Sequence, residues 1–225
     1  MKFPKKEALL FDLDGTLIDS VPDLALAANV MLEKLGRSTF DEEYYREWVG
    51  NGARVMVQRA LSGASELNPN LDKALVDRAL SIYIESYKAN ICVETRLYPE
   101  VESTLNKLRS LGYQLAVVTN KPEFFIVPIL ESLGVADLFC VNVGGGTVSE
   151  CKPSPAQLLY ACEKMGVTVE QSIMIGDSKN DILAAKACEM HSIGLTYGYN
   201  YGEHIAIHGP DVVVDEFGDI LNYIL

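Results

Sequence analysis

Short apolar segments recur along this chain, and helical patterns separate most of them. The runs with the length and composition of buried strands are residues 8–12, 114–119, 139–143, 172–177, 191–196 and 211–215. Helical patterns cover residues 99–111, 155–165 and 180–188. Strands that alternate with helices favour a parallel sheet with helices on both faces. The sequence therefore predicts an α/β fold with a doubly wound parallel sheet.

Residues 19–93 interrupt this alternation. Their helical patterns lie at about 20–35, 41–48, 52–62 and 71–90, with no convincing strand among them. Ser20 and Asp23 have the spacing of a capping box at the first helix start. A helical block of this length is too large for a simple crossover connection. We predict an inserted helical cap domain over residues 19–93 and an α/β core formed by residues 1–18 and 94–225.

The charge balance limits the classes of partner. The chain has 31 acidic and 19 basic residues, a formal net charge of −12. Nucleic acid binding needs a basic surface that matches the phosphate backbone. Anionic membranes also attract basic segments. We therefore expect neither partner, although a local cation can still allow a small anion to bind.

The cysteines and the hydropathy pattern indicate a cellular compartment. The five cysteines form no CxxC pair, and an odd number cannot all be paired within one chain. Free thiols are typical of reducing compartments. No uninterrupted apolar stretch is long enough to cross a bilayer. We expect a cytoplasmic protein, and the sequence leaves a monomer and a homodimer equally open.

Polar side chains gather where the predicted strands end. They are Asp12, Asp14 and Thr16 after the first strand, Thr119, Asn120 and Lys121 after the second, and Asp177, Ser178 and Asp181 after the fourth. Lys152 comes just before a predicted helix start, where Ser154 and Gln157 have capping-box spacing. Ligands bind outside the carboxyl ends of the strands in open α/β sheets. We expect these groups to meet in one crevice.

These residues carry a family resemblance. The sequence resembles the haloacid dehalogenase superfamily of aspartyl phosphotransferases, whose four motifs occur here in order. They are DxDGT at residues 12–16, a hydroxyl at Thr119, Lys152, and GDSxxD at residues 176–181. The resemblance implies a Rossmann-like core, and the block at residues 19–93 matches the position of the helical cap that many members insert.

A finer resemblance concerns four longer stretches. Residues 48–61, 117–122, 176–182 and 195–203 are similar to bacterial phosphoglycolate phosphatases. That similarity implies Mg²⁺-dependent hydrolysis of a small phosphorylated organic acid, 2-phosphoglycolate, to glycolate and phosphate. The reaction is expected to pass through an aspartyl-phosphate, which splits one difficult step into two.

The resemblance also implies roles for individual residues. Asp12 is the expected nucleophile, and Asp14 the general acid and base. Mg²⁺ is expected on oxygen ligands, namely Asp12, the backbone carbonyl of Asp14, and Asp177. The expected phosphate-binding residues are Thr119, Asn120 and Lys152. The residues expected to support them in an outer shell are Asp181, Ser178 and Asn180.

A glycine-containing loop in the cap is the expected source of specificity. Gly50, Asn51 and Gly52 precede a helical pattern, so their N–H groups can hold an anion at a helix N-terminus. The carboxylate of glycolate suits such a site. Arg54 lies on the polar side of the same helix and is a further candidate for substrate binding.

Other functions share part of this pattern. A pyrophosphatase, or a mutase or phosphatase acting on sugar phosphates, has the same four motifs within the superfamily. A second aspartate at position 14 favours phosphoester hydrolysis or mutase chemistry over dehalogenation. A phospho-receiver signalling domain also combines acids, a hydroxyl and a lysine on a parallel sheet. Such a domain is shorter and carries its phosphorylated aspartate on a later strand.

Overall fold

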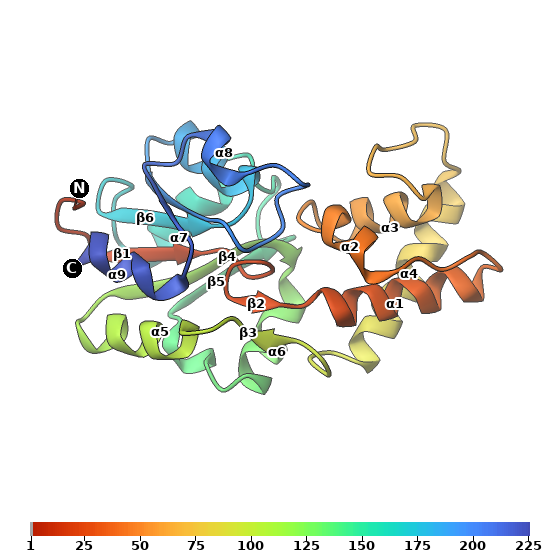
Figure 1. Ribbon diagram of the computed structural model, residues 1–225, viewed down its shortest axis with the longest axis horizontal. Coiled ribbons are helices and arrows are strands. Elements are labelled where there is room, and N and C mark those ends of the chain that lie inside the picture. The colour runs from red at the N-terminus through yellow and green to blue at the C-terminus, as the bar shows by residue number, and fades with distance from the viewer. Residues whose placement is uncertain (1) are drawn as a thin grey trace.

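A six-stranded sheet forms the centre of the computed structural model, which describes residues 2–225 (Figure 1). The strand order is β5-β4-β1-β6-β7-β8, and all neighbours are parallel. The strands are β1 (Ala8–Phe11), β4 (Gln114–Pro122), β5 (Val141–Gly145), β6 (Ser172–Gly176), β7 (His191–Leu195) and β8 (Val212–Val214). Each predicted apolar run forms one of these strands, so the predicted doubly wound α/β fold is confirmed.

Helices cover both faces of this sheet because successive residues of each strand point to opposite faces. Leu9 packs in the cluster that contains Leu105 of α5, whereas Leu10 packs with Leu158 of α7 and Ala184 of α8. The helices of the core are α5 (Val101–Ser110), α6 (Ile126–Ser132), α7 (Ala156–Met165), α8 (Lys179–Ala187) and α9 (Leu221–Ile224).

The inserted segment over residues 20–95 is helical, as predicted. Its helices are α1 (Val21–Lys34), α2 (Glu42–Trp48), α3 (Ala53–Ser62) and α4 (Lys73–Ala89), and they lie beyond the end of the sheet toward which β1 points (Figure 1). The short antiparallel strands β2 (Ile18–Asp19) and β3 (Arg96–Leu97) pair where the chain leaves and re-enters the core. A strand of two residues has no periodicity, so the sequence does not indicate this pair. The exact limits of the cap domain stay a prediction.

The start of α1 differs from the predicted capping box. Ser20 occupies the N-cap position, but its side chain makes no cap hydrogen bond and its hydroxyl donates to Asp14 instead. Asp23 accepts the backbone N–H groups of Glu94 and Thr95 and the Thr95 hydroxyl. The capping-box prediction was wrong because neither side chain bonds within the first turn of α1: Ser20 bonds to Asp14 in the preceding loop and Asp23 to residues more than 70 positions later. Asp23 thereby ties α1 to the segment that re-enters the core.

We expect Asp23→Ala to destabilise the protein strongly. The Asp23 side chain is fully buried, and its removal leaves two backbone N–H groups and one hydroxyl without their acceptor. Losing hydrogen bonds to a buried charged group lowers the free energy of unfolding by about 3 kcal/mol. Urea unfolding followed by circular dichroism measures this change.

Asp41→Ala is the matched control for this substitution. Asp41 is also an aspartate at a helix start, but it is exposed and makes no side-chain cap bond. Its loss should change the free energy of unfolding by about 0.5 kcal/mol or less. Equal losses in the two variants would contradict the role given to Asp23.

The hydropathy of the helices and the state of the cysteines can be compared with the sequence analysis. Within residues 2–225, no helix has the length and apolar character needed to cross a membrane. All five cysteines are free thiols.

Candidate active site

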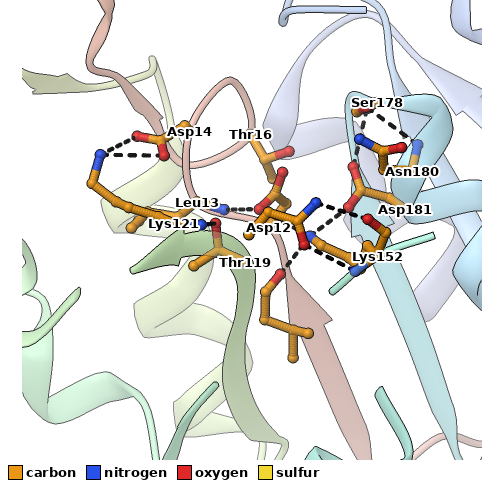
Figure 2. Close-up of polar contacts among 12 residues, drawn as sticks. Asp12, Leu13, Asp14, Thr16, Thr119, Lys121, Lys152, Ser178, Asn180 and Asp181 are labelled. Atoms are coloured by element: carbon orange, nitrogen blue, oxygen red, sulfur yellow. Dashed lines mark hydrogen bonds and ion pairs between the residues drawn. The ribbon is translucent and has the colours of Figure 1, made fainter. Parts of the chain in front are cut away.

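Lys152 joins two of the predicted site aspartates (Figure 2). Its ammonium lies 3.0 Å from Oδ1 of Asp12 and donates at 2.6 Å to Oδ1 of Asp181. A third contact, also 2.6 Å, goes to the carbonyl of Val118 in β4. Lys152 is 3% exposed, so these oxygens replace water around its charge. The buried lysine therefore holds Asp12 in a fixed position at the end of β1.

The titration behaviour of this cluster follows from its burial. Burial lowers the pKa of Lys152, but Asp12 and Asp181 outweigh it, so the net shift of that pKa is upward. Burial raises the pKa of Asp181 to about 7 against the opposing effect of Lys152. Burial, followed by the charge of Asp12, raises the pKa of Asp177 well above its usual range. The site therefore keeps its lysine charged and disfavours further negative charge.

Asp181 is held from two sides. Its Oδ1 accepts from Lys152, and its Oδ2 accepts the backbone N–H of Ser178 at 3.0 Å. The Ser178 hydroxyl accepts the N–H of Asn180 at 3.2 Å, which completes a capping box at the start of α8. This capping box was not predicted. Both Asp181 oxygens are thus engaged, as expected for an outer-shell residue that positions Lys152.

Asp177 lies near Asp12, and its carboxylate is closely packed by Thr16, Tyr199 and Gly198. Its Oδ1 accepts the Thr16 hydroxyl at 2.6 Å, and its Oδ2 accepts the Tyr199 N–H at 2.6 Å. A Cβ atom at Gly198 would lie 2.3 Å from the Asp177 carboxylate, so this close approach requires glycine. Single carboxylate oxygens of Asp12, Asp177 and Asp181 lie within 4.8 Å of one another.

This group of oxygens fits a hard divalent cation. Carboxylate oxygens are the ligands that Mg²⁺ prefers, and burial together with the nearby charges of Asp12 and Asp181 raises the pKa of Asp177, so a cation beside it would favour its charged form. Asp181 belongs to the same group, but its Oδ1 accepts from the charged Lys152 ammonium, whereas both Asp177 oxygens accept only from neutral donors. Asp12 and Asp177 are therefore the side chains best placed to hold the ion.

The end of β4 carries three of the polar residues found in the sequence. The pairing of β4 with β5 is irregular between Val118 and Pro122, and such irregularities re-aim side chains next to active sites. Thr119 is 2% exposed, and its hydroxyl accepts the N–H of Lys121 at 3.2 Å. Asn120 donates to the carbonyl of Lys152 at 2.9 Å and accepts its N–H at 2.9 Å.

Asn120 and Asn180 converge on the glycine-containing loop. Their side-chain amides donate to the same Gly50 carbonyl, at 3.0 and 3.1 Å. A Cβ atom at Gly50 would lie 2.5 Å from the Tyr201 hydroxyl, which accepts from Asn180 as well. One N–H of the Asn120 side-chain amide donates to the Gly50 carbonyl, and the other donates to the Lys152 carbonyl. The Asn120 side chain therefore has no N–H left for a phosphate oxygen.

The predicted capping box at Ser154 is wrong. Helix α7 begins at Ala156, and Gln157 turns into the site instead of toward Ser154. The Gln157 amide donates to the Thr119 carbonyl at 2.9 Å and accepts the Lys152 N–H at 3.2 Å. Gln157 therefore links the loop of Lys152 to the end of β4, which a local capping pattern could not indicate.

A second ion pair lies beside Asp12 (Figure 2). The Lys121 ammonium donates to the two oxygens of Asp14, at 2.9 and 3.2 Å. Ser20 donates to Asp14 from the start of α1. Asp12 and Asp14 thus have separate lysine partners, although only one residue lies between them in the chain.

A small cavity separates this end of the sheet from the cap helices. Its volume is about 40 Å³, roughly room for three water-sized spheres. Its lining residues are Asp12, Asp14, Leu24, Val49, Gly50, Gly52, Ala53, Met56, Tyr83, Tyr87, Thr119, Asn120, Lys121, Pro122 and Phe125. The cavity therefore joins the two aspartates to the glycine-containing loop and to α4.

The structure does not bring every predicted site residue to this cavity. Arg54 is about half exposed and pairs with Asp77 of α4. Asn51 is half-buried but does not line the cavity, whereas its neighbours Gly50 and Gly52 do. Substrate contacts by Arg54 and Asn51 therefore have no support from the geometry.

Three polar residues that line the cavity, Lys121, Tyr83 and Tyr87, were not among the predicted site residues. The sequence marks Lys121 only as a polar residue after a strand, although it is two positions from Thr119 and strand periodicity puts such residues on one side. Tyr83 and Tyr87 lie on α4, where the sequence indicates only a helix with an apolar face. Strand periodicity could therefore have identified Lys121, whereas no feature of the sequence indicates the two tyrosines.

Fold and site together define the class: an α/β enzyme with a buried carboxylate and lysine centre at the carboxyl edge of its sheet. The family model of the haloacid dehalogenase-like hydrolases matches residues 6–189. A phosphoglycolate phosphatase of Colwellia psychrerythraea is 51% identical over 98% of both chains. One of Psychrobacter arcticus is 44% identical over 98% of this chain and 96% of the relative.

A solved structure agrees with these sequence matches. The crystal structure of a predicted phosphoglycolate phosphatase from Haemophilus somnus superposes with a TM-score of 0.91 at 41% identity, over 97% of this chain and 98% of that chain. The chain belongs to the haloacid dehalogenase-like hydrolase family. The predicted family and the assignment as an enzyme are thus confirmed, and the receiver-domain alternative is wrong.

Proposed function

We propose that this protein hydrolyses 2-phosphoglycolate to glycolate and phosphate through an aspartyl-phosphate on Asp12. The observation that carries the proposal is that Asp12 and Asp14 line the same small cavity, each held by its own lysine. The relatives named phosphoglycolate phosphatase, 51% and 44% identical over nearly the whole chain, support the choice of substrate.

In the first step, a carboxylate oxygen of Asp12 attacks phosphorus and the bond to the leaving oxygen breaks. Asp12 Oδ1 already accepts the Leu13 N–H at 2.7 Å and contacts Lys152. Among residues 2–225, no hydrogen bond involves its Oδ2, which leaves that atom available as the nucleophile. Asp14 donates a proton to the leaving oxygen as the bond breaks.

In the second step, water attacks the aspartyl-phosphate, Asp14 takes a proton from that water, and the Asp12 carboxylate is restored. The Thr119 hydroxyl is the donor that we assign to the phosphoryl oxygens, and the Lys152 ammonium supplies positive charge beside them. Mg²⁺, held by Asp12, Asp177 and the carbonyl of Asp14, would offset negative charge on the phosphoryl oxygens when bound.

The size of the cavity favours a small leaving group. A volume of about 40 Å³ accommodates a two-carbon acid more readily than a hexose. Anchoring of the Gly50 carbonyl by Asn120 and Asn180 keeps the cap loop against the core. Those two hydrogen bonds limit how far the cavity can widen.

We expect a clear substrate preference. With Mg²⁺, kcat/KM for 2-phosphoglycolate should exceed that for pyrophosphate or β-glucose 1-phosphate by about tenfold or more, the discrimination that a pocket gains from one well-matched group. Phosphate release measured for the three substrates tests this. Comparable rates on all three, or preference for another, would contradict the proposed substrate while leaving the aspartate chemistry untouched.

A further inference from the structure

Lys121 has an unusual position for a lysine outside the predicted phosphate site. It is 6% exposed and lines the cavity together with Asp14. Its ammonium pairs with the Asp14 carboxylate and lies 4.7 Å from the ring centroid of Tyr87 on α4. A buried lysine is costly unless its charge is used. This ammonium lies at the junction of the core and the cap, on the leaving-group side of Asp12.

Tyr87 adds a second polar group at this place. Its side chain is fully buried and lines the same cavity. Its hydroxyl has no hydrogen-bond partner among residues 2–225, and buried hydroxyls nearly always have one. A ligand in the cavity can supply the missing acceptor. The ring of Tyr87 meanwhile holds Lys121 by a cation–π contact.

We propose that Lys121 and the Tyr87 hydroxyl bind the carboxylate of the substrate's leaving group and so select a phosphorylated acid. This inference rests on the proposed function. In 2-phosphoglycolate, the carboxylate carbon is two bonds from the ester oxygen that Asp14 protonates. A cation 2.9 Å from Asp14 is therefore next to that carboxylate when the ester oxygen faces Asp14.

The charges in the cavity require such a cation. Once Asp14 has given its proton to the leaving oxygen it is negative, and the carboxylate of the leaving group then lies beside it; such like charges repel strongly in a buried site unless a cation lies between them. Lys121 offers three N–H donors, and the two Asp14 oxygens need not occupy all of them. One ammonium can thus hold Asp14 and the substrate carboxylate together. A leaving group without a carboxylate gains nothing from it.

The test compares two substrates on matched variants. Ethyl phosphate has the same number of carbons as 2-phosphoglycolate, with a methyl group in place of the carboxylate. Lys121→Met should lower kcat/KM for 2-phosphoglycolate by about 100-fold, the loss expected when one partner of a buried ion pair is removed. Ethyl phosphate loses only the hold of Lys121 on Asp14, so its kcat/KM should fall less, and the preference for 2-phosphoglycolate should drop by about tenfold or more. Lys121→Arg should keep most of the preference for 2-phosphoglycolate over ethyl phosphate. Tyr87→Phe should lower that preference by about tenfold.

Lys164→Met is the matched control, because Lys164 also lies over a tyrosine ring, that of Tyr160, but is exposed on α7 and does not line the cavity. Lys164→Met should leave kcat/KM unchanged for both substrates. An equal loss on both substrates in Lys121→Met would overturn the inference, since Lys121 would then act only by positioning Asp14. A wild-type enzyme that hydrolyses ethyl phosphate as well as 2-phosphoglycolate would overturn the proposed substrate itself. Circular dichroism and the retained turnover of ethyl phosphate show that each variant is folded.

Discussion

Asp12→Asn is expected to abolish phosphate release, lowering kcat for 2-phosphoglycolate by about 10⁴-fold or more, as removal of an enzymatic nucleophile does. An amide oxygen cannot attack phosphorus to give a stable acyl phosphate, so the first step is lost. The fold should persist, because an asparagine oxygen can still accept the Leu13 N–H and face Lys152. Phosphate release at saturating substrate measures the effect.

Asp137→Asn is the control for this substitution. Asp137 is an exposed aspartate in a short turn of helix at residues 136–138, and its substitution should leave kcat unchanged. Circular dichroism and thermal unfolding should show that both variants are folded. If Asp12→Asn keeps more than about 1% of the activity, a nucleophile other than Asp12 must carry the reaction.

The strands could be predicted because their signal is local. Each buried strand of a parallel sheet faces helices on two sides, so nearly all its residues are apolar, as in residues 8–11. The carboxyl ends of such strands share one edge, which is why the sequence alone predicts that Asp12, Thr119 and Asp177 meet. Chain order and elementary geometry are sufficient for these positions.

The contacts that depend on distant partners could not be predicted. The spacing of Ser20 and Asp23 fits a capping box, yet Ser20 bonds to Asp14 and Asp23 to residues more than 70 positions later. Lys121 shows the same limit, because its importance depends on α4 bringing the Tyr87 ring against its ammonium. Which helix of the cap approaches which strand end is a property of tertiary packing alone.

Metal removal is the other change with a large expected effect. EDTA should lower activity by about 100-fold or more, because charge stabilisation by a metal ion is worth several kcal/mol in the transition state, and added Mg²⁺ should restore it. Asp177→Asn should cause a similar loss that Mg²⁺ does not reverse. Turnover of 2-phosphoglycolate measured across a Mg²⁺ titration distinguishes loss of the ion in the EDTA-treated protein from loss of its ligand in Asp177→Asn.

Thermal unfolding gives a second readout that does not depend on catalysis. An ion that binds only the folded state at about 100 times its dissociation constant adds about 2.7 kcal/mol to the free energy of unfolding. The wild-type protein should therefore unfold at a higher temperature with Mg²⁺ than with EDTA, whereas Asp177→Asn should show little difference. Stabilisation by Mg²⁺ that survives in Asp177→Asn would mean that the ion binds elsewhere.

The pH dependence of this stabilisation follows from the buried acids. Burial raises the pKa of Asp181 from 3.8 to about 7 and raises that of Asp177 as well. With a raised pKa, the folded metal-free protein binds more protons than the unfolded chain, so these groups lower its stability as pH rises from about 4 through about 7. A cation offsets the charge that appears over this interval, so the gain from Mg²⁺ should be larger at pH 8 than at pH 5. An equal gain at both values would contradict a site built on these carboxylates.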